Sequence, residues 1–176
     1  MTTNKGKTIS EEDLDDDDED EDTQKDKFLT FKVGTEEYGL EICYVTEIIG
    51  IQKITEVPDM PDFVKGVINL RGKVIPVMDV RRRFKLEDRE YDEKTCIVVV
   101  NVEDSSVGLV VDTVEEVADI PENQIEPPPN VTGGNKQLFI QGLGKMGDQV
   151  KIILNADKLL YENITDINTE TVPGTA

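Results

Sequence analysis

The segment with the most recognisable catalytic or ligand-binding spacing is Gly142-Leu-Gly-Lys-Met-Gly147, which fits the pattern G-x-G-x-x-G. In a dinucleotide-binding site this motif follows a strand and opens a helix, so that the helix N-terminus faces the pyrophosphate. Here the residues that follow, QVKIIL, alternate like a strand. We therefore expect the glycines to serve a hairpin turn, with a nucleotide-binding enzyme as the alternative that a binding titration would test.

Other residues that could do chemistry are few. The chain has no histidine, which removes the commonest general base and metal ligand and excludes Ser-His and Cys-His nucleophiles. The sequence VMD ending at Asp79 is also found in phospho-acceptor receiver domains, but no alternating long helices follow it here. We expect Asp79 to cap a short helix from Val80 to Phe84. Glu47 and Arg71 could form an acid–base pair, but no substrate pocket is predicted around them.

Arginines form the one dense basic cluster, NLRGKVIPVMDVRRRF at 69–84, in a chain of formal net charge -19. Arg71 stands at a turn between two apolar strands, beside a glycine, where its planar guanidinium can bind carboxylates or backbone carbonyls of a partner. Arg81 to Arg83 end the short helix. We expect them to form a solvated patch that the acidic residues within 87–90 neutralise.

The N-terminal residues 1–27 differ in composition from the rest, because every residue from Glu11 to Asp22 except Leu14 is acidic. Such a run buries too little apolar surface to offset the entropy of ordering, so it predicts a disordered acidic tail that solvates the chain. The acidic balance also argues against binding a nucleic-acid backbone, and a nucleic-acid-binding barrel would need exposed aromatics on a basic face. No apolar run is long enough for a membrane span. The cysteines Cys43 and Cys96, which lack C-x-x-C spacing, suit a reducing cytoplasm.

Short apolar or alternating runs separated by turn residues begin at Phe28 and predict a mainly β fold. The runs are FLTFKV, EEYGLEI, KGVINLR, KVIPVMDV, TCIVVVNV, SSVGLVVD, EEVADI, QLFIQGL and DQVKIIL. Brief helices are expected at 44–49, 80–84 and 157–161. Pro76 has no N–H to donate, so its strand should lie at a sheet edge or carry a bulge there.

An internal repeat organises these strands. YGLEICYVTEI from Tyr38 aligns with VGLVVDTVEEV from Val107 at a constant offset of 69 residues, and FVKG from Phe63 is matched in the same order by FIQG from Phe139. FVKG and FIQG are each followed by a glycine turn, an apolar strand and a short helix. The repeat predicts two small barrels, at about 28–92 and 94–162, that pack together and leave a groove between them.

In these segments the chain resembles the CheW chemotaxis coupling protein family. The run FVKGVINLRGKVIPVMDVRRRF carries most of the resemblance, with YGLEICYVTEI before it and VGLVVDTVEEV, FIQGLGKMGDQVKIIL and ADKLL after it. The resemblance covers residues 28–162 and leaves 163–176 as a flexible C-terminal tail. It implies two intertwined SH3-like five-stranded β barrels packed together with a few short helices, no catalysis and no cofactor. A kinase regulatory domain or a receiver-bearing adaptor of the same fold is the alternative, for which the chain leaves no room.

The resemblance also implies partners and contact positions. Family members bridge the cytoplasmic tip of methyl-accepting chemoreceptors to the regulatory domain of the histidine kinase CheA, in the cytoplasm at membrane receptor arrays. One barrel is expected to bind the kinase domain and the groove to accept the receptor's helical hairpin. The family's partner-binding positions correspond here to Val45, Glu47, Gly66, Arg71, Ile97, Val98, Gly108 and Leu109. Val45 and Glu47 are expected in the first short helix, and Arg71 at the centre of the coupling surface.

Overall fold

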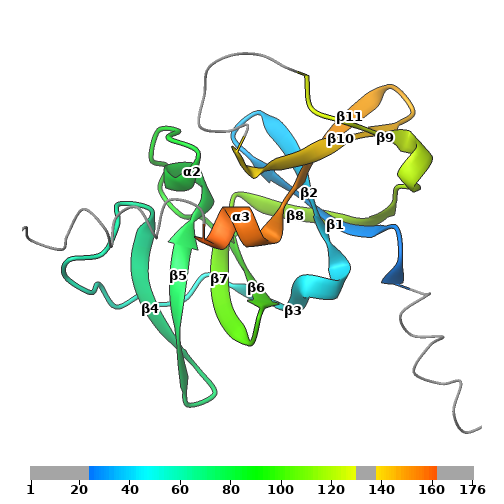
Figure 1. Cartoon of the computed structure of the whole chain (residues 1–176). Coiled ribbons are helices and arrows are strands. Elements are labelled where there is room, and N and C mark those ends of the chain that lie inside the picture. Colours follow the sequence, from blue (N-terminus) through cyan, green and yellow to red (C-terminus); the bar gives the residue numbers. More distant parts are fainter. Residues whose placement is uncertain (1–23, 130–137, 162–176) are drawn as a thin grey trace, which may run out of the picture.

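The computed structural model describes residues 24–129 and 138–161, which form two β-sheets joined by short helices (Figure 1). The predicted disordered tail therefore lies outside the described residues, apart from 24–27, and so does the predicted C-terminal tail. Most of the described chain is strand, which confirms the prediction of a mainly β fold.

The two halves of the described chain repeat the same order of elements. The first repeat comprises β1 (Lys27–Val33), β2 (Glu36–Glu41), the 3-10 helix η2 (Ile42–Tyr44), β3 (Val45–Gly50), β4 (Val64–Leu70), β5 (Lys73–Asp79) and α2 (Val80–Arg83). The second comprises β6 (Cys96–Val102), β7 (Ser105–Val111), β8 (Thr113–Asp119), the 3-10 helix η3 (Glu122–Gln124), β9 (Ile125–Glu126), β10 (Ile140–Met146), β11 (Gln149–Leu154) and α3 (Ala156–Tyr161).

The repeats exchange strands between the sheets. One sheet has six strands in the order β8-β1-β2-β11-β10-β9, and the other has five in the order β3-β6-β7-β5-β4. Each repeat therefore gives its first two strands to the sheet that the other repeat completes. Dividing the barrels at residues 92–94 is wrong for this reason, although the internal repeat itself is present in the structure.

Parallel pairings join the repeats inside each sheet. Val77 of β5 pairs with Gly108 of β7, and at the equivalent positions Ile153 of β11 pairs with Gly39 of β2. The short helices follow in the same way. Asp79 caps α2 by accepting from the backbone N–H of Arg81 at 2.9 Å, as predicted. Sequence-distant strands thus lie side by side, and neither sheet could form from one repeat alone.

The long apolar runs are explained by burial on both faces of a strand. Along β6, Val98 and Val100 belong to the large core shared by both sheets, whereas Ile97 and Val99 fill the interior of the five-stranded sheet. Because side chains alternate along a strand, one continuous apolar segment supplies two cores. Leu159 and Leu160 of α3 complete the shared core, and Figure 1 shows α3 at the junction of the two sheets.

The five-stranded sheet curls until its edges meet. Thr55, in the segment after β3, exchanges two backbone hydrogen bonds of 2.9 Å with Val67 of β4, so the two edge strands are linked. Gly66 makes this closure possible. Its φ is 150°, and a Cβ atom there would lie 2.0 Å from the Thr55 carbonyl oxygen. This closed small sheet agrees with the SH3-like barrel expected from the resemblance.

Two local predictions were tested by the fold. The expected helix at 44–49 is wrong, because only Ile42–Tyr44 forms a 3-10 turn and Val45–Gly50 is strand β3. The β-branched residues and the outward Thr46 and Ile48 fit a strand that lies at the sheet edge. The prediction for Pro76 is wrong, because β5 lies between β7 and β4 and the irregularity in its pairing with β4 falls at Val64–Gly66. The missing N–H is tolerated because the pairing of β5 with β7 covers only Val77–Asp79.

Candidate partner-binding surface

Arg71 occupies the turn of the β4–β5 hairpin. Arg71 and Gly72 both have positive φ, 52° and 83°, as in the two-residue turns that match the twist of paired strands. The Asn69 side chain accepts a hydrogen bond from the Gly72 N–H at 2.8 Å and fixes the turn. The turn therefore holds the Arg71 backbone in a defined conformation while 78% of its side chain stays exposed.

Glu47 of β3 holds the guanidinium of Arg71. Arg71 Nη1 donates to Glu47 Oε2 at 2.8 Å and Nη2 donates to Oε1 at 3.2 Å, a two-point pairing across the closed edge of the barrel. The acid–base pair considered from the sequence is thus present as an ion pair. Because the pair is solvent-exposed, its own contribution to stability is small. What it provides is a fixed direction for an exposed charge.

Two apolar residues that are close in sequence to this pair are also exposed. Ile48, next to Glu47, is 44% exposed and Val74, just after the turn, is 64% exposed. We call Glu47, Ile48, Arg71 and Val74 the hairpin surface. The sequence reasoning missed Ile48 and Val74, although the alternation in VTEII would have directed Ile48 outward had that segment been taken as a strand.

Val45 and Gly66 support the hairpin surface from below. Val45 is half-buried and packs against the core that both sheets share. Gly66 is buried under the closure of the barrel and presents no side chain. Both residues lie close in sequence to the hairpin surface, but their positions suit shaping that surface more than touching a partner.

The remaining four predicted contact residues do not reach the surface. Ile97 and Val98 are 0% exposed and Leu109 is 1% exposed, and Gly108 is buried between β5 and β6. A direct partner contact is therefore wrong for Ile97, Val98, Gly108 and Leu109. A continuous run of β-branched residues, as in CIVVVNV, already indicates a strand buried on both faces.

The three consecutive arginines have separate roles, so the predicted solvated patch is wrong for two of them. Arg81 pairs with Asp112 at 2.6 Å, and only Arg82 pairs with the nearby Asp88, at 3.0 Å. Burial opposes ionisation of Asp112, but the Arg81 hydrogen bonds and the Gly34 N–H outweigh it and lower the pKa of this carboxyl. The ion pair thus stays charged where β7 passes into β8.

Arg83 is buried between the repeats. Its guanidinium carbon lies 4.3 Å from the ring centroid of Phe63 and 4.5 Å from that of Phe139, the equivalent residue of the second repeat. Its Nε donates to the Leu159 carbonyl oxygen at 2.9 Å. Arg83 therefore joins α2 to α3 near the approximate two-fold axis that relates the repeats.

The six-stranded sheet also contains a charged cluster. The Lys151 side chain is 3% exposed and bonds to Glu37 of β2, with Glu115 of β8 at 3.5 Å. Burial is the largest influence on the pKa of Lys151 and lowers it, but the hydrogen bonds and charges of Glu37 and Glu115 together outweigh burial, so the net shift is upward. The same hydrogen bond is the main reason that the pKa of Glu37 is lowered. Lys151 and Glu37 therefore form an ionised pair at neutral pH.

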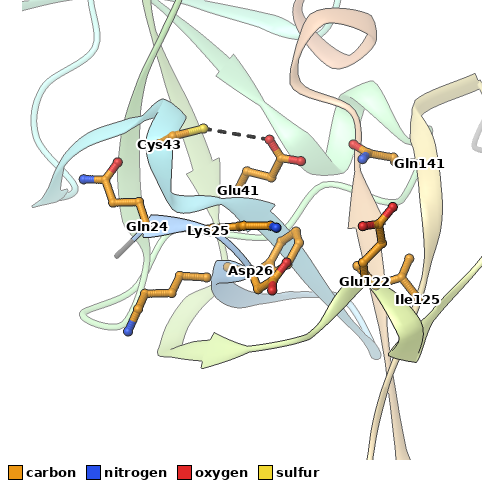
Figure 2. A pocket seen from close by; sticks show the side chains of 10 residues that line it. Gln24, Lys25, Asp26, Glu41, Cys43, Glu122, Ile125 and Gln141 are labelled. Carbon is orange, nitrogen blue, oxygen red and sulfur yellow. Dashed lines mark hydrogen bonds between the residues drawn. The ribbon is translucent and has the colours of Figure 1, made fainter. Parts of the chain in front are cut away.

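A pocket of about 510 Å³ lies at the start of β1, beside Glu41, Cys43 and Gln141 (Figure 2). The Cys43 thiol faces the Glu41 carboxylate at 3.8 Å. Burial, together with the Glu41 charge, raises the pKa of Cys43, so its thiol is not activated as a nucleophile. Within residues 24–129 and 138–161 no group of three potential ligands could hold a metal ion.

The glycine motif at 142–147 lies in the β10–β11 hairpin, as predicted. Met146 pairs with Gln149 around the turn, and β11 follows where a nucleotide site would need a helix. Among the described helices, none is long and apolar enough to cross a membrane.

The chain matches the family model for the CheW-like domain over residues 27–163. It is 40% identical over 134 residues to the chemotaxis protein CheW of Klebsiella aerogenes, which covers 76% of this chain and 81% of that protein. It is 33% identical over 135 residues to that of Bacillus subtilis, covering 77% and 86% of the two proteins. The crystal structure of the scaffolding protein TtCheW from Thermoanaerobacter tengcongensis superposes with a TM-score of 0.73 at 40% identity, covering 78% of this chain and 94% of that chain. The chain therefore belongs to the CheW-like domain family, a family of chemotaxis scaffolding adaptors.

Proposed function

We propose that this chain is a non-enzymatic cytoplasmic adaptor that couples the cytoplasmic tips of chemoreceptors to the regulatory domain of the histidine kinase CheA in membrane receptor arrays. Its family membership supports the adaptor role. The observation that carries the site is the exposed guanidinium of Arg71, which Glu47 holds in a defined direction on a sheet that also exposes Ile48 and Val74.

The hairpin surface has the chemistry of a protein interface. Arginine and exposed apolar residues are the groups that anchor such contacts, and Glu47 reduces the conformational entropy that Arg71 loses on binding. We assign the kinase regulatory domain to this surface. The receptor tip is assigned to the junction of the two sheets beside Val45, where the shared core approaches the surface.

A charge-reversal series tests this assignment. Co-sedimentation with receptor-containing membranes, with and without CheA, compares the native chain, Arg71→Glu and the double variant Glu47→Arg/Arg71→Glu. The double variant restores an internal ion pair but reverses the charge at the turn. If Arg71 touches the kinase, we expect both variants to lose at least tenfold in affinity for CheA.

The controls separate contact from folding. Lys27→Glu breaks an exposed ion pair with Asp119 in the other sheet and should sediment like the native chain. Recovery of binding in the double variant would show that Arg71 only positions the turn. Failure of the native, folded chain to sediment with receptor membranes in either condition would contradict the adaptor proposal itself.

A further inference from the structure

A small groove of about 220 Å³ lies beside the parallel strands β2 and β11 of the six-stranded sheet. It is lined by Glu36, Tyr38, Phe84, Ile140, Ile152 and Leu154. Four of these side chains are apolar, and the polar groups come from Glu36 and Tyr38, which project to the same face of β2 because they are two residues apart. No residue of the hairpin surface lines this groove, so the groove is a separate feature of the molecule.

Tyr38 turns an unused hydroxyl toward the groove. The residue is 2% exposed, and its ring packs on that of Phe84 with 5.1 Å between the centroids. Within residues 24–129 and 138–161 the hydroxyl has no hydrogen-bond partner, although no fully buried side-chain N or O atom there lacks one. The hydroxyl therefore reaches open space, and the groove that Tyr38 lines is that space. Because a buried tyrosine hydroxyl normally has a partner, this one is available to a group that enters the groove.

The charge at the groove is negative. Burial and, to a smaller extent, the charge of Glu36 raise the pKa of Tyr38 to about 12, so the hydroxyl stays protonated at neutral pH and the Glu36 carboxylate lies within electrostatic reach of it. Glu36 is exposed, whereas the buried Lys151 pairs with its neighbour Glu37, on the opposite face of β2. The groove thus offers a carboxylate and a phenol oxygen to a cationic hydrogen-bond donor.

The size and the walls of the groove limit what can occupy it. Pockets for small-molecule ligands usually span about 300–1,000 Å³, so this groove suits a single side chain better than a whole ligand. A lysine side chain has an apolar stem, which fits the isoleucine and leucine walls, and a charged end, which fits Glu36, the Tyr38 hydroxyl and the nearby aromatic rings. The formal net charge of -19 also favours a basic partner.

The equivalent groove of the other repeat lacks these polar groups. This large groove, of about 480 Å³, lies beside β5 and β7, and Ser105 and Val107 stand where the small groove has Glu36 and Tyr38. Its lining includes both Lys73 and Asp104, so it has no net preference for a cation. The large groove therefore serves as an internal control for the chemistry of the small one.

We propose that the small groove binds the alkylammonium end of a lysine side chain from a protein partner. The stem lies against Ile152 and Leu154, and the ammonium group reaches the Glu36 carboxylate and the Tyr38 hydroxyl. The six-stranded sheet then has a contact site whose chemistry differs from that of the hairpin surface, since it accepts a cation where Arg71 presents one.

The probe n-butylamine reproduces a lysine side chain and tests the groove in the full chain. In ¹³C-methyl NMR spectra it should shift the Ile140 and Ile152 signals and leave the signal of Met60, which lines the large groove, unchanged. Tyr38→Phe removes the hydroxyl and keeps the ring, so it should weaken this binding by about tenfold. Glu36→Ser, which copies the other repeat, should weaken it at least as much, whereas Glu93→Ser removes a charge elsewhere and should not.

The uncharged probe 1-butanol has the same stem and should bind more weakly than n-butylamine. Equal binding of the two probes, or equal binding of n-butylamine by the native chain and Tyr38→Phe, would overturn the proposal. These titrations decide the chemistry of the groove whether or not the adaptor role holds.

A second experiment separates a partner's lysine from a free amine, and it alone rests on the proposed function. A carbodiimide joins a carboxylate to a lysine amine as an amide and is itself hydrated to a urea. In mixtures of the full chain with CheA and receptor-containing membranes, peptide mass spectrometry should find Glu36 joined to a lysine of one of these proteins. If the chain co-sediments with the membranes but Glu36 is joined to no partner lysine, the assignment to a protein partner is overturned.

Discussion

The β4–β5 and β10–β11 hairpins occupy equivalent places in the two sheets but present different groups. At the turn of the β4–β5 hairpin, the guanidinium of Arg71 binds Glu47. The residue equivalent to Arg71 in the β10–β11 hairpin is Gly147, and the residue equivalent to Glu47 is Glu116. The backbone is alike at both positions, with φ of 52° and 58°. The second copy also has exposed apolar residues at the equivalents of Ile48 and Val74, namely Val117 and Val150, so the two copies differ at this surface chiefly in the arginine.

The two sheets also differ in which of them contains a buried charge. The six-stranded sheet buries Lys151, which pairs with the partly exposed Glu37 and Glu115, whereas the equivalents of these three residues in the five-stranded sheet are the buried Ile75 and the more exposed Ser106 and Thr46. The sheet with the exposed arginine therefore has the apolar interior, and the sheet without it contains the buried charge. One backbone plan tolerates either interior, provided that each buried charge has its partner.

The largest expected effect compares the equivalent glycines 66 and 142. Gly66→Ala should lower the free energy of unfolding by about 3 kcal/mol or more, because a Cβ would overlap the Thr55 carbonyl and the φ of 150° is strained for alanine. Gly142→Ala should cost less, since its Cβ would meet the Ile125 side chain and the short strand β9, and its φ is not in the strained region. Urea denaturation measures both, and equal losses would contradict the role assigned to Gly66 in barrel closure.

The buried lysine gives the next largest effect. Lys151→Ala removes the buried ammonium and leaves two partly exposed carboxylates without their partner, so it should cost about 2 kcal/mol. The triple variant Lys151→Ile/Glu37→Ser/Glu115→Thr copies the interior of the five-stranded sheet and should recover most of that loss. If the triple variant were less stable than Lys151→Ala in urea denaturation, the two interiors would not be interchangeable.

The sequence predicted best those features that depend on neighbouring residues. The strands, the hairpin at 142–147 and the Asp79 cap follow from alternation and turn residues within a few positions. Strand exchange did not follow from periodicity, which shows that a residue is buried but not which sheet buries it; only the resemblance implied intertwined barrels. The burial of Arg83 has the same origin, since the ring of Phe139 and the carbonyl of Leu159 are remote in the sequence.

For the site, the resemblance singled out both exposed residues and buried ones. Glu47 and Arg71 are joined at the surface, but Ile97 and Leu109 lie in the cores. Residues whose replacement would disturb a surface need not lie on it. The exposed Ile48 was missed because a helix was expected where the edge strand β3 forms.

A smaller effect concerns pH. The pKa of Glu37 is lowered from 4.5 mainly by its bond to Lys151, so its contribution to stability is present above the unfolded value and is lost as the pH falls through the folded value. The native chain should therefore lose stability between neutral pH and about pH 3. The triple variant should lose less over the same range in urea denaturation. Equal slopes would mean that other carboxyls, such as Asp112, account for the acid sensitivity.

The smallest expected effect comes from making the hairpins alike. Gly147→Arg should cost about 1 kcal/mol, because the turn backbone already has the conformation of Arg71 and nothing lies within 4 Å of the added Cβ. An ion pair with Glu116 should return about 0.3–0.5 kcal/mol, which a double-mutant cycle with Glu116→Gln measures in urea denaturation. In an Arg71→Glu background, Gly147→Arg should not restore CheA binding, since the new arginine would lie on the six-stranded sheet, whereas Ile48 and Val74 lie on the five-stranded one. Restored binding would show that the partner recognises the duplicated turn itself, and the distinction between the two hairpins would then rest on one arginine alone.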